Sequence, residues 1–92
     1  PTGISAAVAP GRISIFFAAN PERDVLGYHI YRSTDPAQPK DGWTKLNRAL
    51  LERTTYQDDA VETGVKYYYY LTAVDAAGNV SQPSDVVSET AP

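Results

Sequence analysis

The chain contains no cysteine. This absence excludes disulfide bonds, thiolate metal sites and a cysteine nucleophile. The fold must therefore depend on an apolar core and on backbone hydrogen bonds. The absence does not identify a cellular compartment, because many extracellular β-sandwiches also lack disulfides.

Basic clusters and long apolar runs are missing as well. The eight Lys and Arg residues are scattered singly, and the formal net charge is −3. Because a nucleic-acid surface needs a basic patch, we expect no nucleic-acid partner. No apolar run approaches the roughly 20 residues of a membrane span, so we expect no membrane insertion. With no signal peptide and Pro1 in place of Met, the chain is expected to be a mature fragment or a module of a longer protein.

Residues for catalysis or metal binding are sparse. His29 is the single histidine, and a Ser-His-Asp triad would have to be built around it. Its place beside Tyr28 on an alternating segment instead predicts an outward, solvated side chain. One histidine without cysteine cannot form a zinc site, and neither a calcium-binding loop motif nor a phosphate-binding glycine loop is present. We therefore predict no catalytic residue, no metal site and no cofactor.

Two short motifs each have two interpretations. Asp58-Asp59 and Glu62 form the densest carboxylate group, which could hold an incidental Ca²⁺, whereas Asp58 alone is typical of a turn residue that bonds its own backbone. Asn79-Val80-Ser81 fits an N-glycosylation sequon, whereas in a tight hairpin Asn79 is expected for its tolerance of positive φ.

The residues that are present favour β-strands in one domain. Ninety-two residues allow a single domain over 1–92, and seven tyrosines tilt the composition toward strands. Turn signals recur every 8–12 residues or so, including Ala9-Pro10-Gly11-Arg12 as a type II turn and Asp75-Ala76-Ala77-Gly78 as a type I turn. The predicted strands are 4–8, 12–17, 28–32, 43–46, 54–57, 66–75 and 80–88. Segments 20–24 and 33–42 are predicted loops, and 47–53 is ambiguous because it could hold one helical turn.

Three motifs then point to a family. An apolar residue, a glycine turn and a tyrosine follow one another in Val61-Glu62-Thr63-Gly64-Val65-Lys66-Tyr67. Together with the segments 27–33 and 73–81, in this order, the motif resembles bacterial fibronectin type III domains. The resemblance implies an all-β, immunoglobulin-like sandwich of seven antiparallel strands, with sheets A-B-E and C′-C-F-G. It also implies that Tyr67 fills the core edge while its hydroxyl bonds nearby backbone.

The second strand departs from the family pattern, because Phe17 stands where a tryptophan is usual. We expect neighbouring tyrosines to fill the lost volume. The predicted core residues share inward positions on their strands and are Ile15, Phe17, Tyr28, Ile30, Tyr67, Tyr69 and Leu71.

The opposite side of the same strands is the candidate binding face. If Tyr67 and Tyr69 point inward, then Tyr68, Tyr70 and Thr72 point outward. The predicted outer surface consists of His29, Tyr31, Trp43, Tyr68 and Tyr70. It has three open interpretations: cross-strand pairs that stabilise the sheet, a contact with a neighbouring domain or subunit, and a platform for sugar rings.

The sequence therefore predicts a non-catalytic structural or spacer module of a larger extracellular protein, or a packing unit of an assembly. The alternative is a glycan- or protein-binding module that uses the outer face. The ends 1–3 and 89–92 are expected to be linker-like. Expected partners are neighbouring domains of the same polypeptide or like subunits, with polysaccharide as a further candidate. The bacterial family context, with its secreted enzymes that act on polysaccharides, implies secretion or a cell-surface location.

Overall fold

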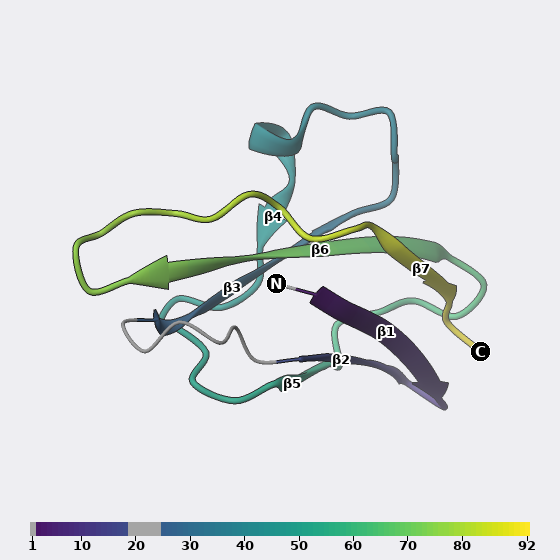
Figure 1. Cartoon of the computed structure of the whole chain (residues 1–92). Helices are drawn as coiled ribbons and strands as arrows, with labels where there is room; N and C mark the ends of the chain where they lie inside the picture. Colours follow the sequence, from purple (N-terminus) through teal and green to yellow (C-terminus); the bar gives the residue numbers. More distant parts are fainter. Residues whose placement is uncertain (1, 19–24) are drawn as a thin grey trace.

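The computed structural model describes residues 2–18 and 25–92 (Figure 1). The loop predicted at 20–24 lies outside these residues. In the described part, the elements are β1 Thr2–Ala9, β2 Arg12–Ala18, β3 Val25–Ser33, the 3₁₀ helix η1 Lys40–Gly42, β4 Thr44–Lys45, β5 Thr55–Asp58, β6 Lys66–Asp75 and β7 Val87–Thr90. The bounds of β6 are those predicted from the tyrosine-rich run.

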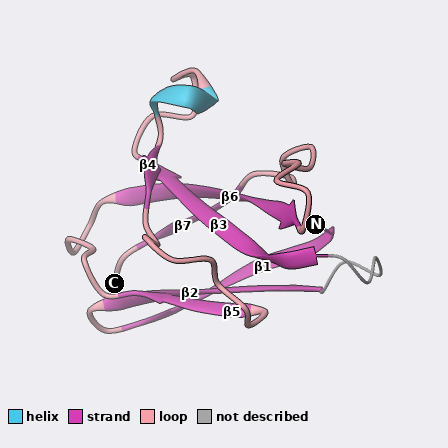
Figure 2. Ribbon diagram, turned by 90° about the vertical axis from the view of Figure 1, so that its left-hand side faces the viewer, coloured by secondary structure: helices cyan, strands magenta, loops and turns pink. Residues whose placement is uncertain are grey.

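The strands form two antiparallel sheets that face one another. One sheet has the order β1-β2-β5 and the other has the order β4-β3-β6-β7. Figure 2 shows the two sheets as separate layers. This is the seven-stranded sandwich predicted from the sequence, and the strand order of sheets A-B-E and C′-C-F-G is confirmed.

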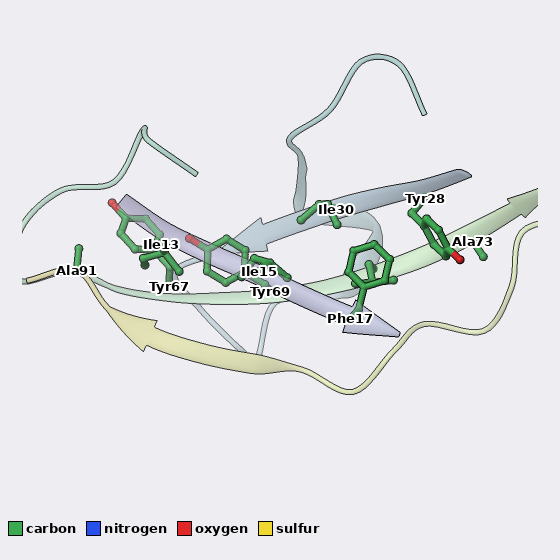
Figure 3. Packing of buried hydrophobic residues seen from close by; sticks show 10 residues of the cluster. Ile13, Ile15, Phe17, Tyr28, Ile30, Tyr67, Tyr69, Ala73 and Ala91 are labelled. Atoms are coloured by element: carbon green, nitrogen blue, oxygen red, sulfur yellow. The ribbon is translucent and has the colours of Figure 1, made fainter. Parts of the chain in front are cut away.

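The core lies where the inward side chains of the two sheets meet. Strand alternation places Ile13, Ile15 and Phe17 of β2 on one side, and all three are buried. The buried cluster consists of Ile13, Ile15, Phe17, Tyr28, Ile30, Tyr67, Tyr69, Leu71, Ala73 and Ala91 (Figure 3). All seven residues expected in the core belong to it.

Two contacts explain how aromatic side chains complete this core. The Tyr67 hydroxyl accepts a hydrogen bond from the backbone N–H of Glu62 at 2.8 Å, and Gly64 supplies the intervening turn with φ +85°. The Phe17 ring meets the Tyr28 ring edge-on at 4.7 Å between centroids. Tyr28 therefore contacts the ring that stands in place of the usual tryptophan, in the manner expected from the sequence.

The last predicted strand, 80–88, is wrong in its extent. β7 covers only Val87–Thr90, and Val80 makes an isolated bridge to Val74. Between these points the hydroxyls of Ser81 and Ser84 accept the backbone N–H groups of Ala73 and Leu71, both at 2.9 Å. Side-chain oxygens thus satisfy these two β6 donors, and Pro83, which has no N–H to give, lies between them.

One ambiguity is resolved and one expectation is corrected. The 47–53 segment forms no helical turn, because Leu51 instead exchanges backbone hydrogen bonds with Tyr28 at 2.9 Å in each direction. The C-terminal end is not linker-like over its whole length, because Thr90 ends β7 and Ala91 is buried. The Ala91 N–H donates to the Val65 carbonyl at 3.0 Å, which ties this end to the domain.

Gly27 marks a close approach of two chain segments. The register of β3 against β6 shifts between Val25 and Gly27, and a Cβ built on Gly27 would lie 2.8 Å from the Leu50 Cβ and 2.9 Å from the Leu51 carbonyl oxygen. We expect Gly27→Ala to lower the free energy of unfolding by about 1–3 kcal/mol, because backbone must move to admit the methyl group. Urea denaturation measures this loss. Gly11→Ala is the matched control for steric overlap, because its added Cβ meets no atom within 4 Å and only its φ of +78° is unfavourable.

A polar cluster joins the two sheets at one edge of the core. The Nη1 atom of Arg32, on β3, donates to both carboxylate oxygens of Asp58, on β5, at 2.8 and 3.0 Å. The Tyr69 hydroxyl donates to the same carboxylate at 2.7 Å. Asp58 also accepts the Ala60 N–H at 3.2 Å, which is the turn bond predicted for it. No local sequence pattern indicates its ion pair with Arg32, which is 26 positions away.

This cluster has a pH dependence that can be measured. Burial, followed by the hydrogen bond to Asp58, raises the pKa of Tyr69 far above that of an exposed tyrosine. The folded chain keeps this proton where the unfolded chain loses it, so the stabilisation by Tyr69 is complete below about pH 10 and declines at higher pH. We expect the free energy of unfolding to fall less steeply above that pH in Tyr69→Phe than in the wild type. Denaturation curves at matched alkaline pH test this, and equal slopes would contradict it.

Candidate functional site

The predicted binding face lies on the outer side of the β4-β3-β6-β7 sheet. The register of β3 and β6 places Tyr31 opposite Tyr70 and His29 opposite Thr72. Trp43 immediately precedes β4 and contacts Tyr70 from the other end of the face. The structure therefore brings together Tyr31, Tyr70 and Trp43 as one aromatic cluster.

The rings of this cluster pack against one another. The Tyr31 and Tyr70 rings are nearly parallel, at 11°, with centroids 4.8 Å apart. The two residues are cross-strand partners in the β3–β6 register, so the rings form a stacked cross-strand pair. Trp43 meets the Tyr70 ring edge-on at 5.0 Å. Stacking a sugar requires an open ring face, and these mutual contacts occupy the faces between the two tyrosines.

The predicted exposure of this face is wrong at three positions. Tyr70 is 5% exposed and Thr72 is 6% exposed, although both lie on the predicted side of β6. Trp43, which was expected near the surface, is also buried. Alternation determines which side of a strand a residue occupies, but neighbouring chain decides whether water reaches it.

The 34–42 loop, which contains η1, is attached to the aromatic cluster. The Trp43 Nε1–H donates to the Gln38 carbonyl at 2.8 Å, and the Tyr70 hydroxyl donates to the Lys40 carbonyl at 3.0 Å. The Ser33 hydroxyl bonds the Gln38 side chain at 2.7 Å. In Figure 1 this loop projects from the sheet above β4. The cluster therefore holds a projecting loop in one shape.

Tyr68 and His29 keep partial exposure at either end of the face. The Lys66 Nζ lies 5.4 Å from the centroid of the Tyr68 ring, which partly covers it. Burial lowers the pKa of His29, Lys45 lowers it further, and a side-chain hydrogen bond with Asn47 opposes both. The His29 Nδ1 has no hydrogen-bond partner, whereas a triad histidine is oriented by a carboxylate at that nitrogen.

The sequon residues take part in the β6–β7 hairpin. Asp75 accepts the Asn79 backbone N–H at 2.8 Å and its side-chain amide at 3.2 Å. Asn79 does not have positive φ, so that explanation for it is wrong, and Gly78 carries the positive φ of +84°. The Gly78 N–H donates to the Asp75 carbonyl at 3.1 Å, as a type I turn requires. Hydrogen bonds from Asn79 lower the pKa of Asp75.

No group of three or more His, Cys, Asp or Glu side chains in residues 2–18 and 25–92 is placed to hold a metal ion. No helix in the same part of the chain is long and apolar enough to cross a membrane.

Comparisons with known proteins agree with this architecture. No family model matches the sequence. A solved Fn3-like protein from Clostridium thermocellum is 30% identical, with a TM-score of 0.84, over 100% of this chain and 91% of that one. Exoglucanase B of Cellulomonas fimi is 33% identical over 98% of this chain. A β-1,2-glucanase from Parabacteroides distasonis is 32% identical over 96% of this chain, with a TM-score of 0.78.

The lengths in these comparisons differ widely. The chain spans 7% of exoglucanase B and 12% of the β-1,2-glucanase chain. The similarity therefore covers one small segment of each of these two larger proteins.

Proposed function

Because this chain belongs to the fibronectin type III family, we propose that it is a non-catalytic spacer module in a larger extracellular protein that acts on polysaccharide. The observation that supports this most is the match of nearly the whole chain to short segments of an exoglucanase and a β-1,2-glucanase. A segment of this size in such a protein leaves the remaining length for a catalytic domain. Polysaccharides are too large to enter cells, which favours a location outside the cell.

The physical properties of the domain suit a spacer. Its long dimension is 40 Å, and its described residues form two sheets joined by the Arg32–Asp58 ion pair. Such a body keeps its ends at a fixed separation, whereas a flexible linker fluctuates around a mean. The Tyr31 and Tyr70 rings stack on one another, which gives the alternative of a sugar-stacking platform less support.

The test replaces the module within its parent polypeptide. A flexible Gly/Ser linker of about 50 residues has a root-mean-square span near that of the module, so it preserves the mean distance and removes the rigidity. We expect lower activity on insoluble polysaccharide and unchanged activity on short soluble oligosaccharides. Unchanged activity on both substrates would refute the spacer function.

A second variant distinguishes a spacer from a glycan-binding module. Tyr31→Ala with Tyr68→Ala removes the two tyrosines of the outer face that keep partial exposure. A spacer predicts full activity on insoluble substrate and no change in pull-down by polysaccharide. Loss of polysaccharide binding in this variant, with the fold retained, would instead favour the binding module.

A further inference from the structure

An open groove lies beside β5, away from the tyrosine face. Its volume is about 510 Å³, within the range of roughly 300–1,000 Å³ typical of binding pockets. The lining consists of Leu50, Leu51, Glu52, Arg53, Thr55, Tyr56 and Gln57. β5 is the last strand of its sheet, so the groove adjoins a free strand edge (Figure 2).

The hydrogen-bond pattern of β5 shows which groups face this edge. The Phe17 N–H donates to the Thr54 carbonyl at 3.1 Å, and Ile15 pairs with Tyr56. Because backbone groups alternate along an antiparallel strand, Tyr56 bonds toward β2. The N–H and C=O groups of Thr55 and Gln57 therefore point away from β2, toward the free edge. Both residues are exposed.

We propose that β5 of a second copy of this chain adds antiparallel to this edge. In a two-fold arrangement centred on Tyr56, Thr55 lies opposite Gln57 of the second copy, and Gln57 lies opposite its Thr55. These are the residues whose backbone groups are free, so each pair can exchange both N–H···O bonds. The two three-stranded sheets become one continuous six-stranded sheet, through an interface that is the same on both sides.

Charged side chains favour this register over the registers that are shifted by two residues. Arg53 lies two residues before β5 and Asp59 directly follows it, so pairing centred on Tyr56 brings the Arg53 end of each copy to the Asp59 end of the other, twice by symmetry. Both residues are exposed, and opposite charges across strands are favourable. Shifting the pairing by two residues places Arg53 opposite Gln57 in one direction and opposite Val61 in the other. Only the centred register uses all the free backbone groups and both ion pairs.

The small surface area that this pairing buries makes the association weak. A short strand edge buries much less than the roughly 1,200 Å² of a stable complex, so we expect a dissociation constant of about 1 mM. Association then becomes significant where copies are held close together, since short flexible linkers give effective concentrations of that order. This surface does not depend on the proposed spacer function, and either can fail without the other.

Amide NMR spectra of the chain from about 0.05 to about 2 mM test the proposal across the expected dissociation constant. The Thr55 and Gln57 amide signals are expected to shift with concentration. Gln57→Pro removes an outward N–H without breaking the ladder to β2, and it should abolish the shifts. Gln57→Ala, which keeps the N–H, is the matched control and should retain them. Thermal unfolding verifies that each variant is folded.

A charge exchange gives the second readout. Arg53→Glu and Asp59→Lys each place like charges opposite one another and should weaken self-association at least tenfold. An equimolar mixture of the two variants restores both ion pairs and should recover the wild-type shifts. Concentration-independent spectra, shifts centred on another edge strand such as β1, or a mixture no stronger than the single variants would each overturn the proposal.

Discussion

Replacing Asp58 with alanine is expected to lower the free energy of unfolding by about 3–5 kcal/mol. The Asp58 side chain is 4% exposed and accepts hydrogen bonds from Arg32, Tyr69 and Ala60. Its removal leaves the Arg32 guanidinium, in a side chain that is 20% exposed, with the Ala60 carbonyl at 3.2 Å and the Tyr67 ring at 5.1 Å as its remaining contacts. An uncompensated charge in this position is much more costly than a lost surface contact.

Three controls separate the causes of this loss. Asp59→Ala removes an exposed neighbouring carboxylate and should change stability by less than about 0.5 kcal/mol. Tyr69→Phe removes one hydrogen bond and should cost about 1 kcal/mol. The double variant Arg32→Met with Asp58→Leu should be more stable than Asp58→Ala, because no unpaired charge remains. Guanidinium denaturation measures the free energy of unfolding of Asp58→Ala and of the three controls. Equal losses for Asp58→Ala and Asp59→Ala would show that the hydrogen-bonded cluster around Asp58 does not stabilise the fold.

Replacing Trp43 with alanine is expected to lower the free energy of unfolding by about 3 kcal/mol and to release the 34–42 loop. Trp43 is 6% exposed, contacts Tyr70, and donates its indole N–H to the Gln38 carbonyl. The variant loses both the apolar contact and the hydrogen bond. Amide hydrogen exchange should accelerate across 34–42 while the exchange of β2 residues changes only with global stability.

Tyr68→Ala is the matched control on the same face. Tyr68 is half-buried and is partly covered by Lys66, so its loss should cost less than about 1 kcal/mol and leave exchange in the loop unchanged. If Trp43→Ala left exchange across 34–42 at the wild-type rate, the loop would be held by its own hydrogen bonds and not by the aromatic cluster.

The parts of the fold that the sequence predicts are those governed by short-range rules. The alternation of Tyr67, Tyr68 and Tyr69 assigns them to opposite faces because side chains in a strand repeat every second residue. The glycine turn before Tyr67 identifies the corner, since the spacing is local. The strand order then follows from the family resemblance, and the structure has the same order.

The parts that the sequence does not predict depend on contacts between distant segments. Arg32 and Asp58 are 26 positions apart and lie in different sheets, so no local pattern relates them. The burial of Tyr70 depends on Lys40, which is 30 positions away. The predicted strand 80–88 includes Ser81 and Ser84, because nothing in the local sequence indicates that a serine hydroxyl will replace a backbone acceptor. A side chain's direction is local, whereas its neighbours are set by the whole fold.

The hydroxyls of Ser81 and Ser84 also affect how the domain behaves in a crowded solution. Along the stretch of β6 that β7 does not cover, the N–H groups of Leu71 and Ala73 are already bonded, and Pro83, between the two serines in sequence, has no N–H to donate. A strand of another molecule cannot pair with this part of β6, because these backbone N–H groups are already hydrogen-bonded. Amyloid-like growth, which needs unpaired backbone groups at a strand edge, therefore cannot begin here. We therefore expect the irregular 81–86 segment to protect against aggregation. Restoring a regular strand there, for example with Pro83→Val, would lengthen an open edge and lower the solubility limit of the domain.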